Sequence, residues 1–125
     1  MTDADHTPGG ISIHAVDISR GVPAEGLRVQ LLRLDGCSEI EVAKGECNES
    51  GLLVHPIAKG IGAERGLYIL RFDVGSYFRA ADVNISNPGF LETAEFHFGV
   101  DRIEEHFHLP IKFTPWGYSL FRGGA

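Results

Sequence analysis

Apolar and polar residues alternate most regularly near the end of the chain, in residues 106–113. Read with a period of two, one face of this segment carries Phe107, Leu109, Ile111 and Phe113. The other face carries His106, His108, Pro110 and Lys112. The pattern predicts a strand that buries its aromatic and aliphatic face in a core. Its two histidines then lie on the opposite side, where they are free for chemistry because the core does not use them.

The same reading of the whole chain predicts a series of short strands separated by turns rich in Gly, Pro and Asn. The predicted strands are residues 11–17, 27–34, 39–44, 52–55, 67–74, 93–100 and 106–113, with a further short one at 83–85. Residues 75–81 lack the alternation and predict one or two helical turns. A slip in the alternation at Leu31–Leu32 predicts either a β-bulge or a strand that is partly buried on both faces. The fold class expected from this pattern is all-β, a two-sheet β-sandwich.

Length and composition are typical of one soluble domain. The chain has 125 residues, of which 43% are apolar and 22% charged. We interpret residues 1–10 as a flexible tail and residues 11–125 as the folded domain. A net charge of −6 without a basic cluster argues against nucleic acid and anionic membranes as partners. The sequence shows neither a secretion signal nor a transmembrane run, so we expect a cytoplasmic protein.

Two histidines at alternate positions of a strand place their imidazoles about 6.5–7 Å apart on one face. A metal site would need further ligands, such as a Glu a few residues later, but residues 109–112 are Leu, Pro, Ile and Lys. No acidic motif with ligand spacing occurs elsewhere, so we expect no metal. Taken singly, each histidine is most simply an ordinary surface residue.

Two other residues change this interpretation. His14 is predicted to point outward from the strand at 11–17, and Arg122 lies three residues before the end of the sequence. Hydrolysis of a cyclic amide requires an imidazole that accepts a proton from water and a cation that holds the developing oxyanion. Two neutral imidazoles and a guanidinium would provide both. Composition and periodicity alone do not bring these three groups together.

Several motifs between Ile11 and the C-terminal end resemble the transthyretin-like family, in particular its 5-hydroxyisourate hydrolases. Ile13-His14-Ala15-Val16-Asp17 and Gly21-Val22-Pro23-Ala24 resemble the family's His-Val-Leu-Asp segment and its Gly-x-Pro-Ala turn. His106-Phe107-His108-Leu109-Pro110 resembles the His-Tyr-His-Val-Pro motif. Pro115-Trp116-Gly117-Tyr118-Ser119 and Phe121-Arg122-Gly123-Gly124 resemble Pro-Tyr-Gly-Tyr-Ser and the terminal Tyr-Arg-Gly-Ser.

The resemblance implies a transthyretin-like (prealbumin-like) two-sheet sandwich with one short helix, assembled as a homotetramer that is a dimer of dimers. It also implies hydrolysis of 5-hydroxyisourate, the unstable product of urate oxidation, by water attack that opens the six-membered ring without a cofactor. Matched residue by residue, His14 and His108 are expected to position and activate the water. Arg122 is expected to orient the substrate and stabilise negative charge on its carbonyl oxygen. His106 is expected to support the site or the fold.

The expected substrate-binding residues are Leu52, His106, Phe121, Gly123 and Gly124, and three of them depart from the family pattern. Leu52 stands where the family has an arginine, Phe121 replaces a tyrosine and Gly124 replaces a serine. Each change removes a hydrogen-bonding group, which would leave polar groups of a ureide ring unpaired at about 1–3 kcal/mol each. An N-methylated ring, such as one from methylxanthine or caffeine breakdown, has methyl groups that favour apolar contact.

Two hypotheses about function therefore remain open. A hydrolase for 5-hydroxyisourate or an N-methylated analogue explains why both histidines are present while polar groups are lost. A catalytically weakened small-molecule-binding protein, as transthyretin itself is, explains the lost polarity but gives no reason for both histidines. We expect the hydrolase.

Overall fold

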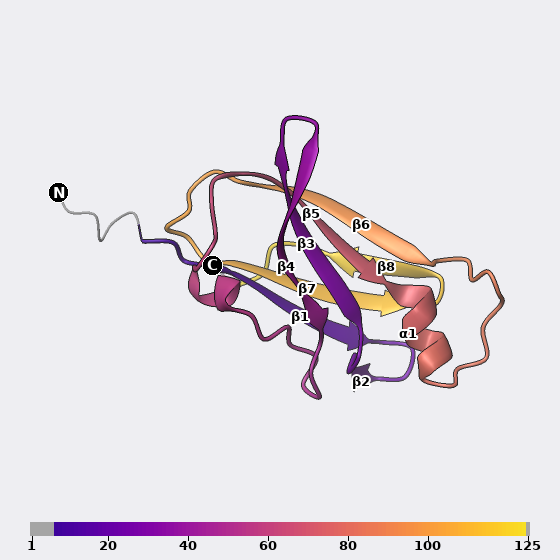
Figure 1. Cartoon of the computed structure of the whole chain (residues 1–125). Helices are drawn as coiled ribbons and strands as arrows, with labels where there is room; N and C mark the ends of the chain where they lie inside the picture. Colours follow the sequence, from indigo (N-terminus) through magenta and orange to yellow (C-terminus); the bar gives the residue numbers. More distant parts are fainter. Residues whose placement is uncertain (1–6, 125) are drawn as a thin grey trace.

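The computed structural model describes residues 7–124, and within them eight strands form two four-stranded sheets stacked face to face (Figure 1). The first sheet has the order β2-β1-β7-β8 and contains β1 (Ile11–Asp17), β2 (Val22–Pro23), β7 (Phe107–Thr114) and β8 (Gly117–Leu120). The second sheet has the order β4-β3-β5-β6 and contains β3 (Arg28–Asp35), β4 (Ser38–Glu46), β5 (Gly66–Asp73) and β6 (Thr93–Val100). The predicted all-β sandwich is confirmed.

Two short helical segments accompany the sheets. Helix α1 (Val74–Ala80) follows β5 directly and lies at one end of the sandwich (Figure 1). A 3-10 turn (Pro56–Lys59) lies in the long connection between β4 and β5. No helix in the described range is long and apolar enough to cross a membrane. The single short helix predicted at 75–81 is confirmed, one residue earlier than expected.

Strands β1 and β7 lie side by side in the middle of the first sheet although they are far apart in sequence. They pair in parallel, with Ser12 opposite His108 and His14 opposite Pro110. Parallel neighbours need a long connection, and here the entire second sheet lies in that connection. This pairing places the two histidine-bearing segments next to each other.

The space between the sheets is filled by the apolar positions that the alternation predicts. The buried side chains of β7 are Phe107, Leu109, Ile111 and Phe113, and the positions between them are partly or fully exposed. In β1, Ile11, Ile13 and Ala15 are buried in the same way. Full burial of one such large side chain is worth about 1.5–3 kcal/mol. The core therefore fixes which face of β1 and β7 points away from it.

Asp17, at the end of β1, is a charged residue with no exposed surface. Its carboxylate accepts hydrogen bonds from the Ser19 hydroxyl at 2.5 Å, from Nε of Arg20 at 2.7 Å and from the Tyr77 hydroxyl at 3.2 Å. Burial by itself would raise the pKa of this carboxyl, but the hydrogen bonds from Ser19, Arg20 and Tyr77 bring it below its usual value. Because Tyr77 belongs to α1, its bond to Asp17 joins the helix to the first sheet.

Most predicted strands are present, and the predicted bulge is confirmed because the register of β3 against β4 shifts between Leu31 and Leu32. Two predicted strands are wrong. Residues 52–55 contribute an isolated bridge between Leu52 and His14, because Pro56 starts the 3-10 turn directly afterwards. Residues 83–85 form no strand. Strands β2 and β8 were not predicted, since two and four residues are too few to show an alternation.

Residues 1–6 of the predicted tail lie outside the described residues, and the segment that follows them runs along the start of β7. The Gly9 N–H donates to the Ile103 carbonyl at 2.7 Å, and the Gly10 carbonyl accepts from the Phe107 N–H at 2.9 Å. A Cβ at Gly9 would lie 2.5 Å from the backbone carbonyl of Glu105. Glycine is therefore needed for the chain to approach this closely.

Candidate active site

Two imidazoles face each other on the outer side of the first sheet. His14 on β1 and His108 on β7 are both partly exposed and lie on the face away from the core. Their ring planes differ by 22° and their ring centroids are 6.5 Å apart. This arrangement follows from the pairing of the strands, because His108 lies opposite Ser12 and His14 is the next outward residue of β1. The structure thus brings these two predicted residues together.

The loop before the 3-10 turn docks onto β1 beside His14. The Ala15 N–H donates to the Gly51 carbonyl at 2.8 Å, and Nε2 of His14 lies 2.9 Å from the Ser50 carbonyl oxygen. Gly51 has a φ of +82°, and a Cβ there would lie 2.3 Å from the carbonyl oxygen of Ala15. A side chain at Gly51 would therefore push the loop away. The docking places Leu52 in a backbone bridge with His14.

His108 belongs to a chain of hydrogen bonds on the same face. Its Nδ1 lies 2.7 Å from the Ser12 hydroxyl oxygen, which is 2.8 Å from Nε2 of His106. Nδ1 of His106 lies 2.6 Å from the carbonyl oxygen of Gly9. Burial lowers the pKa of His108, and repulsion from a charge on His14 or His106 would lower it further. His108 is thus favoured in its neutral form, which can accept a proton.

The end of the described chain lies along β7 next to His108. The Gly123 N–H donates to the His108 carbonyl at 2.8 Å and forms a backbone bridge. Gly124 has a φ of +58°, and a Cβ there would lie 3.6 Å from the Cβ of His108. Phe121 is exposed, and Nζ of Lys112 lies 5.7 Å from the centroid of its ring. The two predicted glycines therefore border His108, whereas Phe121 lies nearer to Lys112.

Arg122 takes a different direction from the one expected. Its Nη2 donates to Oε1 of Glu105 at 3.0 Å and to the His106 carbonyl at 3.2 Å. Its guanidinium carbon lies 4.0 Å from the centroid of the Phe107 ring, a residue of the core face. Within residues 7–124 its hydrogen bonds and ring contacts include neither His14 nor His108. The structure does not join this guanidinium to the imidazole pair.

The donor set on this face suits proton transfer. Across the described part of the chain, no three His, Cys, Asp or Glu side chains converge as a metal centre would require. His14, His106 and His108 each use at least one ring nitrogen on a serine hydroxyl or a backbone carbonyl. Imidazole is the side chain that ordinarily serves for proton transfer to and from water, and these contacts hold the rings in place.

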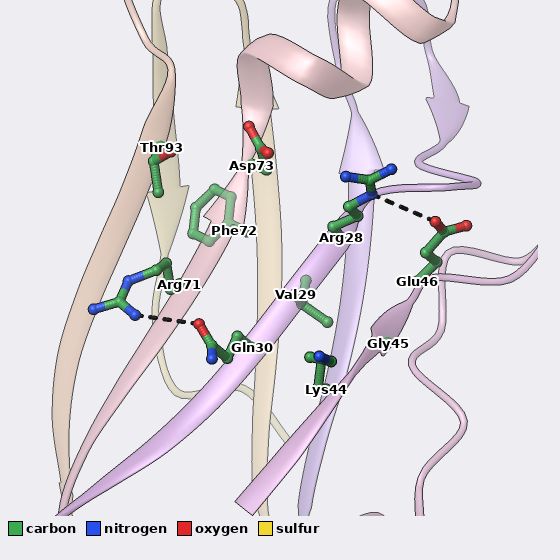
Figure 2. Close-up of a pocket in the computed structure, with 10 residues that line it drawn as sticks. All are labelled: Arg28, Val29, Gln30, Lys44, Gly45, Glu46, Arg71, Phe72, Asp73 and Thr93. Atoms are coloured by element: carbon green, nitrogen blue, oxygen red, sulfur yellow. Dashed lines mark hydrogen bonds and ion pairs between the residues drawn. The ribbon is translucent and has the colours of Figure 1, made fainter. Parts of the chain in front are cut away.

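A groove of about 560 Å³ lies on the other sheet, where Figure 2 shows its lining residues on β3, β4 and β5 and at the start of β6. Among its charged side chains, Arg28 pairs with Glu46 at 3.5 Å and Arg71 donates to Gln30 at 3.2 Å. The residues that line it include no histidine and no cysteine. It therefore lacks a side chain that ordinarily exchanges protons near neutral pH, and the histidine face remains the candidate site.

Comparison with known proteins establishes the family. The sequence model of the HIUase/Transthyretin family, in which HIUase stands for 5-hydroxyisourate hydrolase, matches residues 11–123. The chain belongs to this family. A protein of Rhizobium meliloti named 5-hydroxyisourate hydrolase 2 is 36% identical over 115 residues, which cover 92% of this chain and 96% of that protein.

Two solved structures in the same comparison support this family membership. The 5-hydroxyisourate hydrolase of Klebsiella pneumoniae has a TM-score of 0.73 and 32% identity, covering 91% of this chain and 97% of that one. The crystal structure of (S)-allantoin synthase has a TM-score of 0.86 and 31% identity over 96% of this chain. This chain spans 45% of the length of that longer protein.

The match to the HIUase/Transthyretin family covers the segments that carry the imidazole pair, from β1 through the docked loop to β7 and Gly123. Sequence reasoning selected His14, His108 and Leu52 but assigned no role to Ser12. The alternation did contain the signal, because Ser12 shares the outward face with His14. The carbonyl groups of Gly9 and Ser50 were missed because backbone groups leave no mark in a side-chain motif.

Proposed function

We propose that this member of the HIUase/Transthyretin family is a cytoplasmic hydrolase that opens the six-membered ring of 5-hydroxyisourate or an N-methylated analogue. The reaction would belong to urate or methylxanthine breakdown. The observation that carries the proposal is the pair of partly buried imidazoles, 6.5 Å apart, presented by β1 and β7. The similar proteins of Rhizobium meliloti and Klebsiella pneumoniae are named 5-hydroxyisourate hydrolases, which supports this substrate class.

In the proposed reaction a water molecule bound between His14 and His108 attacks a ring carbonyl carbon. One imidazole accepts a proton from the water as the new C–O bond forms, and the carbonyl oxygen becomes an oxyanion. The tetrahedral intermediate then collapses and the ring C–N bond breaks. The imidazolium returns the proton to the departing nitrogen, so the enzyme ends in its starting state. Water and substrate supply every atom, and no cofactor is required.

Arg122 is proposed to orient the substrate and to stabilise the oxyanion. Its guanidinium has to leave Glu105 in order to do so. The side chains of this ion pair are 44% and 39% exposed, and exposed ion pairs are worth only about 0–1 kcal/mol. A substrate rich in carbonyl groups can therefore replace Glu105 at small cost, and it also has to compensate for the contacts with the His106 carbonyl and the Phe107 ring.

The residues around the imidazoles favour an N-methylated ring over one that carries N–H groups. Leu52 is directly opposite His14 in an antiparallel bridge, so the two side chains lie on the same face, and Leu52 is 41% exposed. Gly124 offers no hydroxyl beside His108, and Phe121, which lies nearer to Lys112, has no phenol group. Apolar contact with an N-methyl group would stabilise the complex, whereas an N–H in the same place would lack an acceptor.

The proposed assembly is a homotetramer, a dimer of dimers, with the histidine face between subunits. The first sheet, its turns and the segments that adjoin it leave several large apolar side chains between 38% and 70% exposed: Ile18, Val22, Leu52, Trp116 and Phe121. We propose that a second subunit covers these side chains, since contiguous apolar surface on a protein usually marks an interaction site. A second subunit over this face would also limit access of bulk water to the small-molecule substrate.

The test is to generate 5-hydroxyisourate and its trimethyl analogue enzymatically in solution and to follow their decay by ultraviolet absorbance. We expect the protein to accelerate the decay of at least one, and His108→Asn to abolish the acceleration without changing thermal unfolding, because His108 lies outside the core. His97→Asn is the matched control, because His97 is exposed on β6 of the other sheet. If neither substrate decays faster, the protein is instead a small-molecule-binding relative of transthyretin.

A further inference from the structure

We infer that Ser12 and His106 are positioning residues that fix the tautomer of His108 and thereby make its Nε2 the atom that accepts the proton from water. The catalytic part of this inference rests on the proposed function. The tautomer itself is a property of the protein alone and can be measured without any substrate.

The chain of hydrogen bonds begins at a group that can only accept. The carbonyl oxygen of Gly9 lies 2.6 Å from Nδ1 of His106, so this nitrogen must carry a hydrogen. In neutral His106 the lone pair is then on Nε2. The Ser12 hydroxyl, 2.8 Å from that nitrogen, must therefore be the donor. The carbonyl is firmly placed, because the Gly9 N–H is bonded to Ile103 at 2.7 Å.

The direction in which the Ser12 hydroxyl donates its hydrogen bond determines which ring nitrogen of His108 carries a hydrogen. A serine hydroxyl has one hydrogen, and here His106 receives it. The Ser12 oxygen can then only accept from Nδ1 of His108, which lies 2.7 Å away. Nδ1 of His108 consequently carries the ring hydrogen, and Nε2 keeps its lone pair. Nε2 is the ring atom at the far end from the backbone, where a water between the two imidazoles can reach it.

His14 is held in the opposite tautomer. Its Nε2 lies 2.9 Å from the carbonyl oxygen of Ser50, so Nε2 carries the hydrogen and the lone pair falls on Nδ1, close to the strand. Of the two imidazoles, His108 alone presents an unprotonated nitrogen at the tip of its ring. The lowered pKa of His108 agrees with this assignment, since it favours the neutral form. His108 is therefore the residue that accepts the proton, and His14 holds the water or the substrate.

The test combines a direct measurement of tautomers with kinetics. Protein labelled with ¹⁵N-histidine is studied by long-range ¹H–¹⁵N NMR at pH 8, where imidazoles of ordinary pKa are neutral. We expect the hydrogen of His108 on Nδ1 and that of His14 on Nε2. Ser12→Ala removes the acceptor at Nδ1, so the hydrogen of His108 can move to Nε2 and block the base. We expect kcat to fall about ten- to hundredfold with little change in KM.

Two further variants separate positioning from a general structural effect. Ser12→Thr keeps the hydroxyl and should restore both the tautomer and kcat, while Ser38→Ala, at the exposed start of β4, should change neither. If Ser12→Ala does not fold, His106→Phe serves instead: the Ser12 hydrogen is then free to turn toward His108, and the same shift to Nε2–H is expected.

The outcomes distinguish this inference from the proposed function. A wild-type His108 with its hydrogen on Nε2 would overturn the inference even if the protein hydrolyses its substrate rapidly. An unchanged His108 tautomer and kcat in Ser12→Ala would overturn it as well. A wild-type His108 with its hydrogen on Nδ1 in a protein that hydrolyses neither substrate would support the hydrogen-bond chain and refute the proposed function.

Discussion

Leu52 determines what the His14 imidazole meets on its loop side, because the two residues form a backbone bridge. Leu52→Arg adds a guanidinium that can pair with carbonyl and N–H edges of an unmethylated ring. A recovered hydrogen bond of about 1–3 kcal/mol corresponds to a rise of roughly 5- to 150-fold in kcat/KM for 5-hydroxyisourate. We expect kcat/KM for the trimethyl analogue to fall. Steady-state kinetics with both substrates measure the change.

The control for this substitution is Val54→Arg, which adds the same charge in the same loop at a side chain that is 79% exposed. It should leave the ratio of the two kcat/KM values unchanged. If Leu52→Arg shifts the ratio toward the methylated ring, or fails to shift it, the preference for N-methyl groups is refuted.

How far single residues could be predicted depends on whether a local pattern fixed them. The outward direction of His14 and His108 follows from the period of two. In each strand the apolar positions that alternate with the histidine must face the core, so the histidine faces away from it. The direction of Arg122 does not follow from any period. It is set by Glu105 and the ring of Phe107, and a contact between side chains from two segments is invisible in the sequence.

At the scale of elements, Asp17 links β1 to α1 through Tyr77. Asp17→Asn removes the charge that Ser19, Arg20 and Tyr77 bond to, and we expect unfolding free energy at pH 7 to fall by about 1.5–3 kcal/mol. The pKa of Asp17 is lowered in the folded protein, so its stabilising contribution is present at neutral pH. It is lost as the pH falls from about 5 through the lowered pKa.

Urea unfolding at pH 7 and at successively lower pH checks this prediction. The difference in unfolding free energy between wild type and Asp17→Asn should become smaller as the pH is lowered. Asp35→Asn, an exposed aspartate at the end of β3, should show almost no difference at any pH. If the difference in unfolding free energy between wild type and Asp17→Asn became larger at acidic pH, the assigned role of the carboxylate would be contradicted.

The elements that the sequence predicted well are those whose own residues bury a face. Strands β1 and β7 supply buried side chains at alternate positions, and β5 and β6 also turn apolar side chains toward the core. The bounds of all four came within a residue or so of the prediction. Strand β2 has two residues, and its existence depends on pairing with Val16 and Asp17. The strand predicted at 52–55 is absent for the opposite reason. Its local pattern suggests a strand, but the backbone turns into the 3-10 turn at Pro56.

For the whole molecule, the exposed apolar residues of the first sheet predict self-association. Sedimentation should give a mass four times the 13.6 kDa of the chain. Trp116→Glu places a charge on a residue that is 70% exposed in the turn between β7 and β8, and we expect smaller assemblies with lower activity. Phe90→Glu is the control, because Phe90 is 81% exposed in the connection between α1 and β6. A fully active wild-type monomer would refute the shared site.

The parallel pairing of β1 with β7 has a consequence for the timing of biosynthesis. The entire second sheet lies between β1 and β7 in sequence, so the imidazole pair cannot assemble until β7 has left the ribosome. Contacts between such distant segments also require closure of a long loop, which slows folding. A nascent polypeptide that stalls before β7 would carry only one half of the proposed site, and we expect it to be inactive.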